Sequence, residues 1–90
     1  MNKKILIIDD EKTLSNSLRE GLGDLGYEAE TAASGEEGLE KVVSFQPHLV
    51  FLDLRLPGIG GLEVLKKIKN ADKNIDVVML TAYADTNTAV

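Results

Sequence analysis

Three short apolar runs alternate along the chain with segments of helical periodicity. The runs occupy residues 5–8, 49–52 and 77–80, and each ends at polar residues. Short unbroken apolar runs of this kind are typical of strands that are buried on both faces of a parallel sheet. Residues 27–32 alternate polar and apolar side chains, which predicts a fourth strand at an exposed edge of the sheet.

The segments between these runs predict three amphipathic helices. The first covers residues 13–25 and stops at Gly26. The second begins with Ser34 and Glu37 in the spacing of a capping box, and the third follows Gly61. The positions that helical spacing predicts to face the core are Leu14, Leu18, Leu22, Leu25, Leu39, Val42, Val43, Leu62, Leu65 and Ile68.

This alternation predicts one α/β domain over residues 1–90, with a doubly wound parallel sheet and right-handed crossovers. Hydrophobic residues make up 43% of the chain and charged residues 28%, which fits a folded domain rather than a disordered chain. The formal net charge of -5 argues against direct binding to nucleic acid, for which a basic face is expected. The chain has no cysteine, which excludes disulfides and thiolate metal sites. Because no apolar run is long enough to cross a membrane, we expect a cytoplasmic protein.

Functional side chains follow three of the predicted strands. Asp9 and Asp10 come directly after the first apolar run, Asp53 follows the run at 49–52, and Thr81 follows the last. Because the carboxyl ends of parallel strands lie at one edge of a sheet, we expect these groups to converge where open α/β sheets bind their ligands. Each residue alone has an ordinary structural explanation, since Asp and Thr are frequent at helix caps and turns. It is the complete set at one edge that indicates a functional site.

Three carboxylates in one place repel one another, and a hard divalent cation offsets this repulsion. Ligation by oxygen alone suits Mg²⁺, so Asp9, Asp10 and Asp53 predict a site for one Mg²⁺ or Mn²⁺ ion. A metal beside a carboxylate at a strand end indicates phosphoryl chemistry. The metal neutralises phosphoryl oxygens, and an aspartate can be the nucleophile that forms an acyl phosphate.

Four pieces of the sequence carry a resemblance to a known family, and they are residues 7–11 (IIDDE), 52–58 (LDLRLPG), 61–62 (GL) and 80–82 (LTA). Together with their spacing, they resemble the receiver domain of bacterial response regulators, over all 90 residues. Residues 81–85 are most similar to receivers that precede ATPase-type transcription activators. The resemblance implies a flavodoxin-like sheet order 2-1-3-4-5. It also implies a phosphoprotein of a two-component system that relays a signal, as a conformational switch, to an output domain or partner.

The resemblance further implies a role for each site residue. Asp53 accepts the phosphoryl group from a histidine kinase or a phosphotransfer protein. Asp10 binds Mg²⁺ directly, Asp9 binds it through water, and the backbone carbonyl of Arg55 is a further ligand. The phosphoryl group is held by two more groups, the hydroxyl of Thr81 and the backbone amide of Ala82. Such a domain is not a conventional enzyme, because the reactions it catalyses are its own phosphorylation and dephosphorylation.

The sequence departs from the family at its end, where the fifth strand and the last helix have no counterpart. That strand would start roughly 25 residues after Val77 by the usual βαβ repeat. We therefore expect a receiver truncated before strand five, without the family's phosphate-binding lysine and with weakened phosphoryl chemistry. An output domain or target protein is expected beyond residue 90. The open apolar edge at 77–80 predicts aggregation, dimerisation or strand exchange between copies.

Two other functions stay open at this point. A Mg²⁺-dependent phosphatase or phosphotransferase with an aspartyl-phosphate intermediate would use the same acids. Such enzymes need a second acid two residues after the nucleophile, where this chain has Arg55. An interaction module that is not phosphorylated would keep only the fold, and the intact set of acids argues against that alternative.

Overall fold

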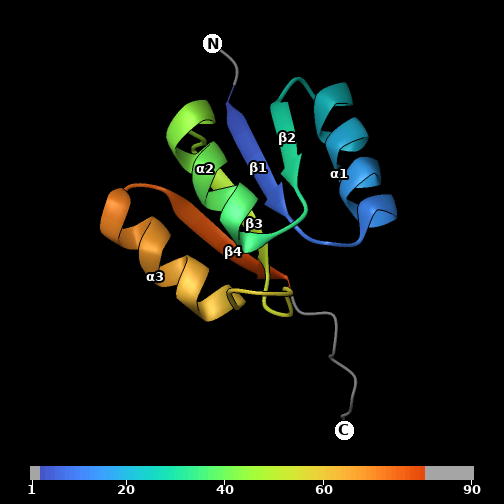
Figure 1. Cartoon of the computed structure of the whole chain (residues 1–90). Helices are drawn as coiled ribbons and strands as arrows, with labels where there is room; N and C mark the ends of the chain where they lie inside the picture. Colours follow the sequence, from blue (N-terminus) through green and yellow to red (C-terminus); the bar gives the residue numbers. More distant parts are fainter. Residues whose placement is uncertain (1–2, 81–90) are drawn as a thin grey trace, which may run out of the picture.

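Strands and helices alternate strictly along residues 3–80, which are the residues that the computed structural model describes (Figure 1). The elements within this range are β1 (Lys4–Ile8), α1 (Lys12–Asp24), β2 (Glu28–Ala32), α2 (Gly35–Phe45), β3 (Leu49–Asp53), α3 (Gly61–Ala71) and β4 (Asp76–Leu80). The predicted alternation is confirmed. Helix α1 is displaced by one residue from its predicted bounds, β2 begins one residue later than predicted, and β1 and β4 each begin one residue earlier. None of the helices in this range combines the length and the apolar character that crossing a membrane requires.

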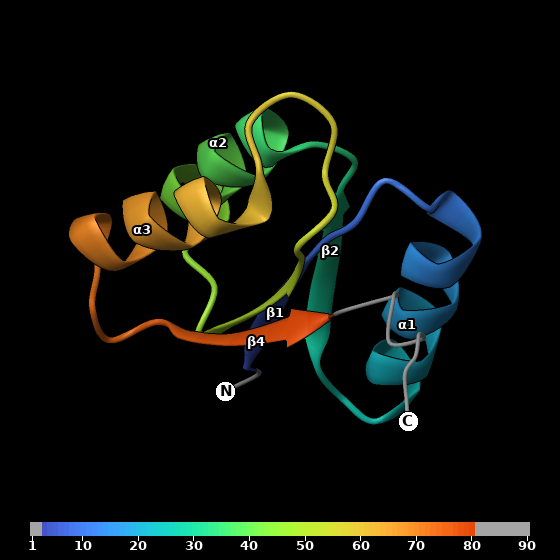
Figure 2. The same cartoon turned by 90° about the horizontal axis from the view of Figure 1, so that it is seen from below.

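The four strands within the described range form one parallel sheet in the order β2-β1-β3-β4, as predicted. Helices α2 and α3 pack against each other over one face of the sheet, and α1 lies against β1 and β2 on the other face (Figure 2). The register places Ile8 beside both Ala32 and Leu52, and it places Asp53 beside Leu80. The carboxyl ends of all four strands therefore lie along one edge.

The core lies mainly between the sheet and the helices α2 and α3. Alternate residues of the two central strands belong to this core and are fully buried, namely Leu6, Ile8, Val50 and Leu52. Their buried partners on the helices are Val42, Val64 and Ile68. Full burial of one large aliphatic side chain contributes about 1.5–3 kcal/mol relative to its exposure. The strands that end in the acidic residues are thus the most firmly packed part of the domain.

The end of α1 confirms the predicted stop at Gly26. The Tyr27 N–H donates to the Leu22 carbonyl at 3.0 Å, and the Gly26 N–H donates to the Gly23 carbonyl at 3.0 Å. These two bonds form a Schellman motif, which requires a left-handed residue after the helix. Gly26 has a φ of 96° and meets this requirement without strain.

The start of α2 confirms the predicted cap at Ser34. Its Oγ accepts a hydrogen bond from the Glu37 N–H at 3.1 Å. The Glu37 carboxylate accepts from the N–H of Ala33, at 2.9 Å, rather than from the N–H of Ser34 as a capping box prescribes. The reciprocal bond of the box is therefore displaced by one residue toward β2.

The predicted buried stripes of α2 and α3 are wrong at one position each. Val43 and Leu62 are 72% and 64% exposed, although helical spacing predicts that both face the core. The helix faces that meet the core carry Gly38 and Val64 instead. A β-carbon added at Gly38 would lie 2.5 Å from Cδ1 of Ile8, so α2 approaches the sheet along a glycine. A pattern of apolar side chains does not mark a contact of this kind.

The leucine stripe of α1 is only partly buried, which also differs from the prediction. Leu18 and Leu22 are partly exposed, and Leu14 and Leu25 are 40% and 75% exposed. Within residues 3–80, α1 is the one helix on its face of the sheet (Figure 2). The side of α1 that points toward β3 and β4 is therefore left open by the described residues.

Candidate functional site

Three carboxylates meet at the carboxyl edge of the sheet. Asp9 and Asp10 follow β1, Asp53 is the last residue of β3, and one oxygen from each lies within 4.8 Å of the other two. Asp9 and Asp53 are only 5% and 6% exposed, whereas Asp10 is exposed. The structure thus brings together the three acids that define the predicted metal site. The predicted phosphoryl ligands Thr81 and Ala82 lie outside the described residues.

Each buried carboxylate is oriented by the backbone of the turn that follows it. Oδ1 of Asp9 accepts from the Glu11 N–H at 2.9 Å, and Oδ1 of Asp53 accepts from the Arg55 N–H at 3.0 Å. These are Asx turns, in which an aspartate bonds the amide two residues ahead. Among residues 3–80, the second oxygen of each carboxylate has no hydrogen-bond donor. As far as residues 3–80 are concerned, both remaining oxygens are open to an ion or a substrate.

The electrostatics of the site disfavour the ionised form of Asp9. Burial is the largest cause that raises the pKa of this carboxyl above its ordinary value of 3.8, and the hydrogen bond from the Glu11 amide lowers it. The negative charges of Asp53, Asp10 and Glu11 raise the pKa further. Like charges and desolvation act in the same direction here, so a cation at this place would stabilise the folded protein.

The ion pairs that join two residues of the described range lie away from the three acids. The ion pairs in residues 3–80 lie on the helices and on β2, and they join Lys41 to Glu30, Lys41 to Glu37 and Lys67 to Glu63. A partly buried acidic cluster that takes no part in these ion pairs is the arrangement expected of a cation site.

The acids border a cavity of about 470 Å³ that opens beside α1. Its walls are Asp9, Asp10, Glu11, Leu14, Leu18, Asp53, Arg55 and Leu80. The apolar side of this cavity comes from the open leucine stripe of α1, and its floor comes from the ends of the strands. A small polar group can therefore reach the acids from solvent.

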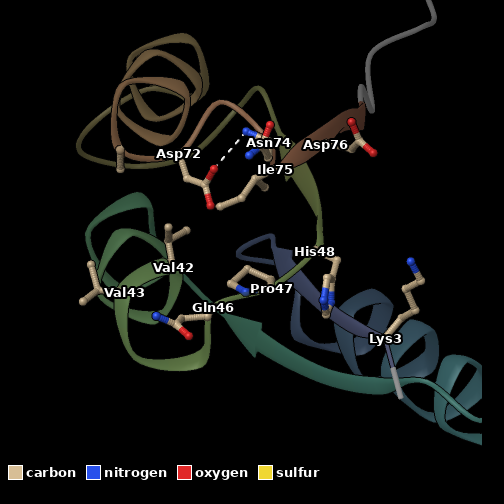
Figure 3. A pocket seen from close by; sticks show the side chains of 11 residues that line it. Lys3, Val42, Val43, Gln46, Pro47, His48, Asp72, Asn74, Ile75 and Asp76 are labelled. Atoms are coloured by element: carbon tan, nitrogen blue, oxygen red, sulfur yellow. Dashed lines mark hydrogen bonds between the residues drawn. The ribbon is translucent and has the colours of Figure 1, made fainter. Parts of the chain in front are cut away.

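A larger cavity, of about 600 Å³, lies at the other end of the strands, beside their amino ends (Figure 3). Pro47, His48 and Ile75 are among the residues of its wall, and Asp72 uses its carboxylate to accept from the Asn74 N–H at 2.9 Å within its own turn. Within residues 3–80, the one cluster of potential metal ligands is the group at the carboxyl edge. The smaller cavity is therefore the candidate site.

The donor set fits Mg²⁺. This ion prefers six oxygen ligands at about 2.0–2.1 Å, so two oxygens on one ion are at most about 4.2 Å apart. Only oppositely placed ligands reach that separation, and neighbouring ligands lie about 2.9 Å apart. The three carboxylate oxygens lie within 4.8 Å of one another, so they can surround one ion when retained waters complete its shell. One carboxylate is exposed, which leaves room for the waters that Mg²⁺ usually retains.

Comparison with known proteins places the chain in a family. The family model for the response regulator receiver domain matches residues 5–90. The chain belongs to the response regulator receiver family. Receiver domains of this family act in two-component signal transduction, where response regulators work with histidine kinases and output domains.

Several receivers of known name or structure are similar to this one. Sporulation initiation phosphotransferase F of Bacillus subtilis is 42% identical over 85 residues, which are 94% of this chain and 68% of that protein. The alkaline phosphatase synthesis transcriptional regulatory protein PhoP of the same species is 42% identical over 82 residues, which are 91% of this chain and 34% of that protein. The crystal structure of the response regulator protein TrrA from Thermotoga maritima, in complex with Mg²⁺-BeF, matches with a TM-score of 0.84 and 45% identity. That match covers 91% of this chain and 71% of the TrrA chain.

Two residues of this receiver domain shape the backbone around the acids, although the sequence analysis did not count them among the site residues. A β-carbon on Gly61 would lie 2.7 Å from the Asp53 carbonyl oxygen and 2.6 Å from Cα of Leu54, so only glycine lets α3 start this close to the end of β3. Ser15 is the one buried residue of α1 and bonds the backbone of Asp9. The pair of Gly60 and Gly61 at the start of α3 is a visible signal in the sequence, but a serine inside a helix is not.

Proposed function

We propose that Asp53 of this receiver domain accepts a phosphoryl group and that Asp9 and Asp10 hold a Mg²⁺ ion beside it, for which Mn²⁺ can substitute. The observation that carries the proposal is the convergence of three carboxylate oxygens within 4.8 Å at the ends of two neighbouring strands. Family membership supports the same assignment. The complex of TrrA with Mg²⁺-BeF supports magnesium as the metal.

The proposed step forms one bond and breaks one bond. A carboxylate oxygen of Asp53 attacks the phosphorus of a phosphohistidine whose other ring nitrogen carries a proton. The phosphorylated nitrogen keeps the electron pair of the broken P–N bond, so the histidine leaves as neutral imidazole. The Arg55 N–H holds Oδ1 of Asp53, so the plane of the carboxylate is set before the substrate arrives. A bound divalent cation supplies neutralisation of the phosphoryl oxygens. Attack of water on the same phosphorus regenerates the carboxylate and releases phosphate.

Three further groups complete the proposed site. The backbone carbonyl of Arg55 is a metal ligand, and the Thr81 hydroxyl and the Ala82 amide hold the phosphoryl group. The Asx turn at Asp53 supports the first assignment, because it brings the Arg55 backbone next to the carboxylate. The pairing of Leu80 with Asp53 supports the other two, because β4 ends beside the nucleophile one residue before Thr81.

The proposed partners are a histidine kinase or a phosphotransfer protein as donor and an output domain or target protein as recipient of the signal. The net charge of -5 supports a receiver that does not itself bind nucleic acid, and we propose a cytoplasmic location. Among the strands of residues 3–80, β4 lies at the end of the sheet opposite β2. This edge supports dimerisation or strand exchange through β4.

Intact-mass spectrometry of the purified protein with a small acyl phosphate and Mg²⁺ tests the function. We expect one phosphoryl group per chain, dependent on Mg²⁺ and removed by hydroxylamine, which cleaves acyl phosphates. A phosphatase would instead turn over an added phosphate ester, and an interaction module would do neither. Either of those outcomes would reject the proposal.

A further inference from the structure

Ser15 is a buried polar residue in an otherwise open helix. Its exposed fraction is 3%, and it is the one buried residue of α1. A buried hydroxyl requires a hydrogen-bond partner, and Ser15 has two within reach. Its Oγ lies 3.1 Å from the Glu11 carbonyl oxygen and 3.2 Å from the Asp9 carbonyl oxygen.

The two carbonyl acceptors belong to different parts of the chain. Glu11 is four residues before Ser15, and a bond from a serine hydroxyl to this carbonyl is common inside helices. Asp9 is six residues before Ser15 and lies outside the helix, at the carboxyl end of β1. The hydroxyl, donating to both oxygens as a three-centre bond, therefore ties the first turns of α1 to the strand that carries the acids.

With this bond, the N–H and the carbonyl of Asp9 both form hydrogen bonds, and so does its side chain. Its N–H donates to the Ala32 carbonyl at 3.0 Å, its carbonyl accepts from Ser15, and its side-chain Oδ1 accepts from the Glu11 N–H. Asp10 lies between these fixed points. Three carboxylates that repel one another would otherwise relax apart, and a metal would then have to draw them together again.

From these contacts we infer that Ser15 is a positioning residue for the metal site, which holds the backbone of Asp9 and Asp10 in the arrangement that binds Mg²⁺. The inference rests on the proposed function. Residues that orient metal ligands typically change metal affinity about 10–100-fold when they are replaced. We expect Ser15→Ala to weaken Mg²⁺ binding about tenfold, at the low end of that range, because Ser15 acts through a backbone carbonyl.

The experiment is a Mg²⁺ titration of the purified protein by calorimetry, with the dissociation constant as the measured quantity. Ser15→Thr keeps the hydroxyl, and the polar cavity of about 380 Å³ beside Ser15 accommodates the added methyl group, so this variant should restore wild-type affinity. Ser17→Ala makes the same chemical change on the exposed face of α1 and should leave the affinity unchanged. Ile75→Val, in a buried position at the opposite edge of the sheet, lowers stability without touching the acids and should also leave it unchanged.

Equal Mg²⁺ affinity of Ser15→Ala and the wild type would overturn the inference. So would affinity of Ser15→Thr as low as that of Ser15→Ala. If the wild type binds no Mg²⁺ at all, the proposed function fails and this inference falls with it, which separates the two failures. Should the alanine variant not fold, Ser15→Cys carries the same prediction, because a thiol keeps the volume and is only a weak donor.

Discussion

Replacing Asp53 by Asn should stabilise the metal-free protein. The change keeps the shape of the side chain and removes one of three negative charges whose oxygens lie within 4.8 Å of one another. Two unit charges at 4.8 Å repel by about 0.9 kcal/mol in water and by about 3.5 kcal/mol at an effective dielectric constant of about 20. Asp9 and Asp53 are both buried, so the repulsion energy between them is closer to the larger value. Asp10 is exposed, so its repulsion with Asp53 is closer to the smaller value.

The hydrogen bond from the Arg55 N–H to Asp53 opposes part of this gain. Asn still accepts that bond, but a bond to a neutral acceptor is weaker than one to a carboxylate, by about 1 kcal/mol. We therefore expect the free energy of unfolding to rise by about 1–3 kcal/mol at neutral pH and low salt. In a domain of this size, 1 kcal/mol corresponds to about 4–8 °C in melting temperature.

Thermal unfolding in EDTA, followed by circular dichroism, measures this difference. Asp76→Asn is the matched control, because Asp76 is an exposed aspartate at the opposite edge of the sheet. The part of the gain that comes from the exposed Asp10 should shrink in 1 M salt, where the Debye length falls to about 3 Å, whereas the buried pair of Asp9 and Asp53 is screened much less. If Asp53→Asn melts at or below the wild-type temperature in EDTA, or gains no more than Asp76→Asn, the acids do not repel as the structure indicates.

Three other predictions concern the metal, the cap of α2 and the packing of the core. Millimolar Mg²⁺ should raise the melting temperature, because an ion that binds only the folded protein stabilises it, and Asp10→Asn should remove most of that rise. A wild-type melting curve that does not change with Mg²⁺ would reject the metal site. The amide hydrogen bond and then Lys41 lower the pKa of Glu37 below its ordinary 4.5, so its stabilisation is present above that pH and lost as the pH falls through the lowered value. The difference in unfolding free energy between wild type and Glu37→Gln, from urea titrations, should therefore shrink on acidification, and a constant difference would contradict this reasoning. Gly38→Ala should lower the free energy of unfolding by about 1–3 kcal/mol, because the added β-carbon would lie 2.5 Å from Ile8. Gly23→Ala has open space around it and should raise the free energy of unfolding by up to about 1 kcal/mol. Equal effects of the two substitutions would refute the close contact at Gly38.

The strands and their acidic ends could be predicted because both depend on local features of the chain. An apolar run that ends in Asp53 contains the information for a buried strand and for the edge at which its carboxylate emerges. The left-handed residue at Gly26 and the cap at Ser34 are also local, since each depends on the backbone within one turn of helix. For these features the sequence prediction and the structure agree.

The helix faces could not be predicted to the same degree. Helical spacing sets which residues share a stripe, but contacts with other elements decide which stripe meets the core. Val43 and Leu62 are apolar and exposed, because α2 approaches the sheet at Gly38 and α3 meets the core through Val64. The contact of Ser15 with Asp9 could not be predicted from the sequence either, because the bond to the Asp9 carbonyl depends on the path of the loop between β1 and α1.

The central claim is that Asp53 is the phosphoacceptor, and peptide mapping of the phosphorylated protein tests it most directly. The protein is treated with an acyl phosphate and Mg²⁺, reduced with borohydride to trap the acyl phosphate, digested and sequenced by mass spectrometry. We predict modification at Asp53 in the wild type and none at this position in Asp53→Asn. Modification of Asp9 or Asp10 in the wild type, or labelling of Asp53→Asn at another site as efficient as wild-type labelling, would contradict the claim.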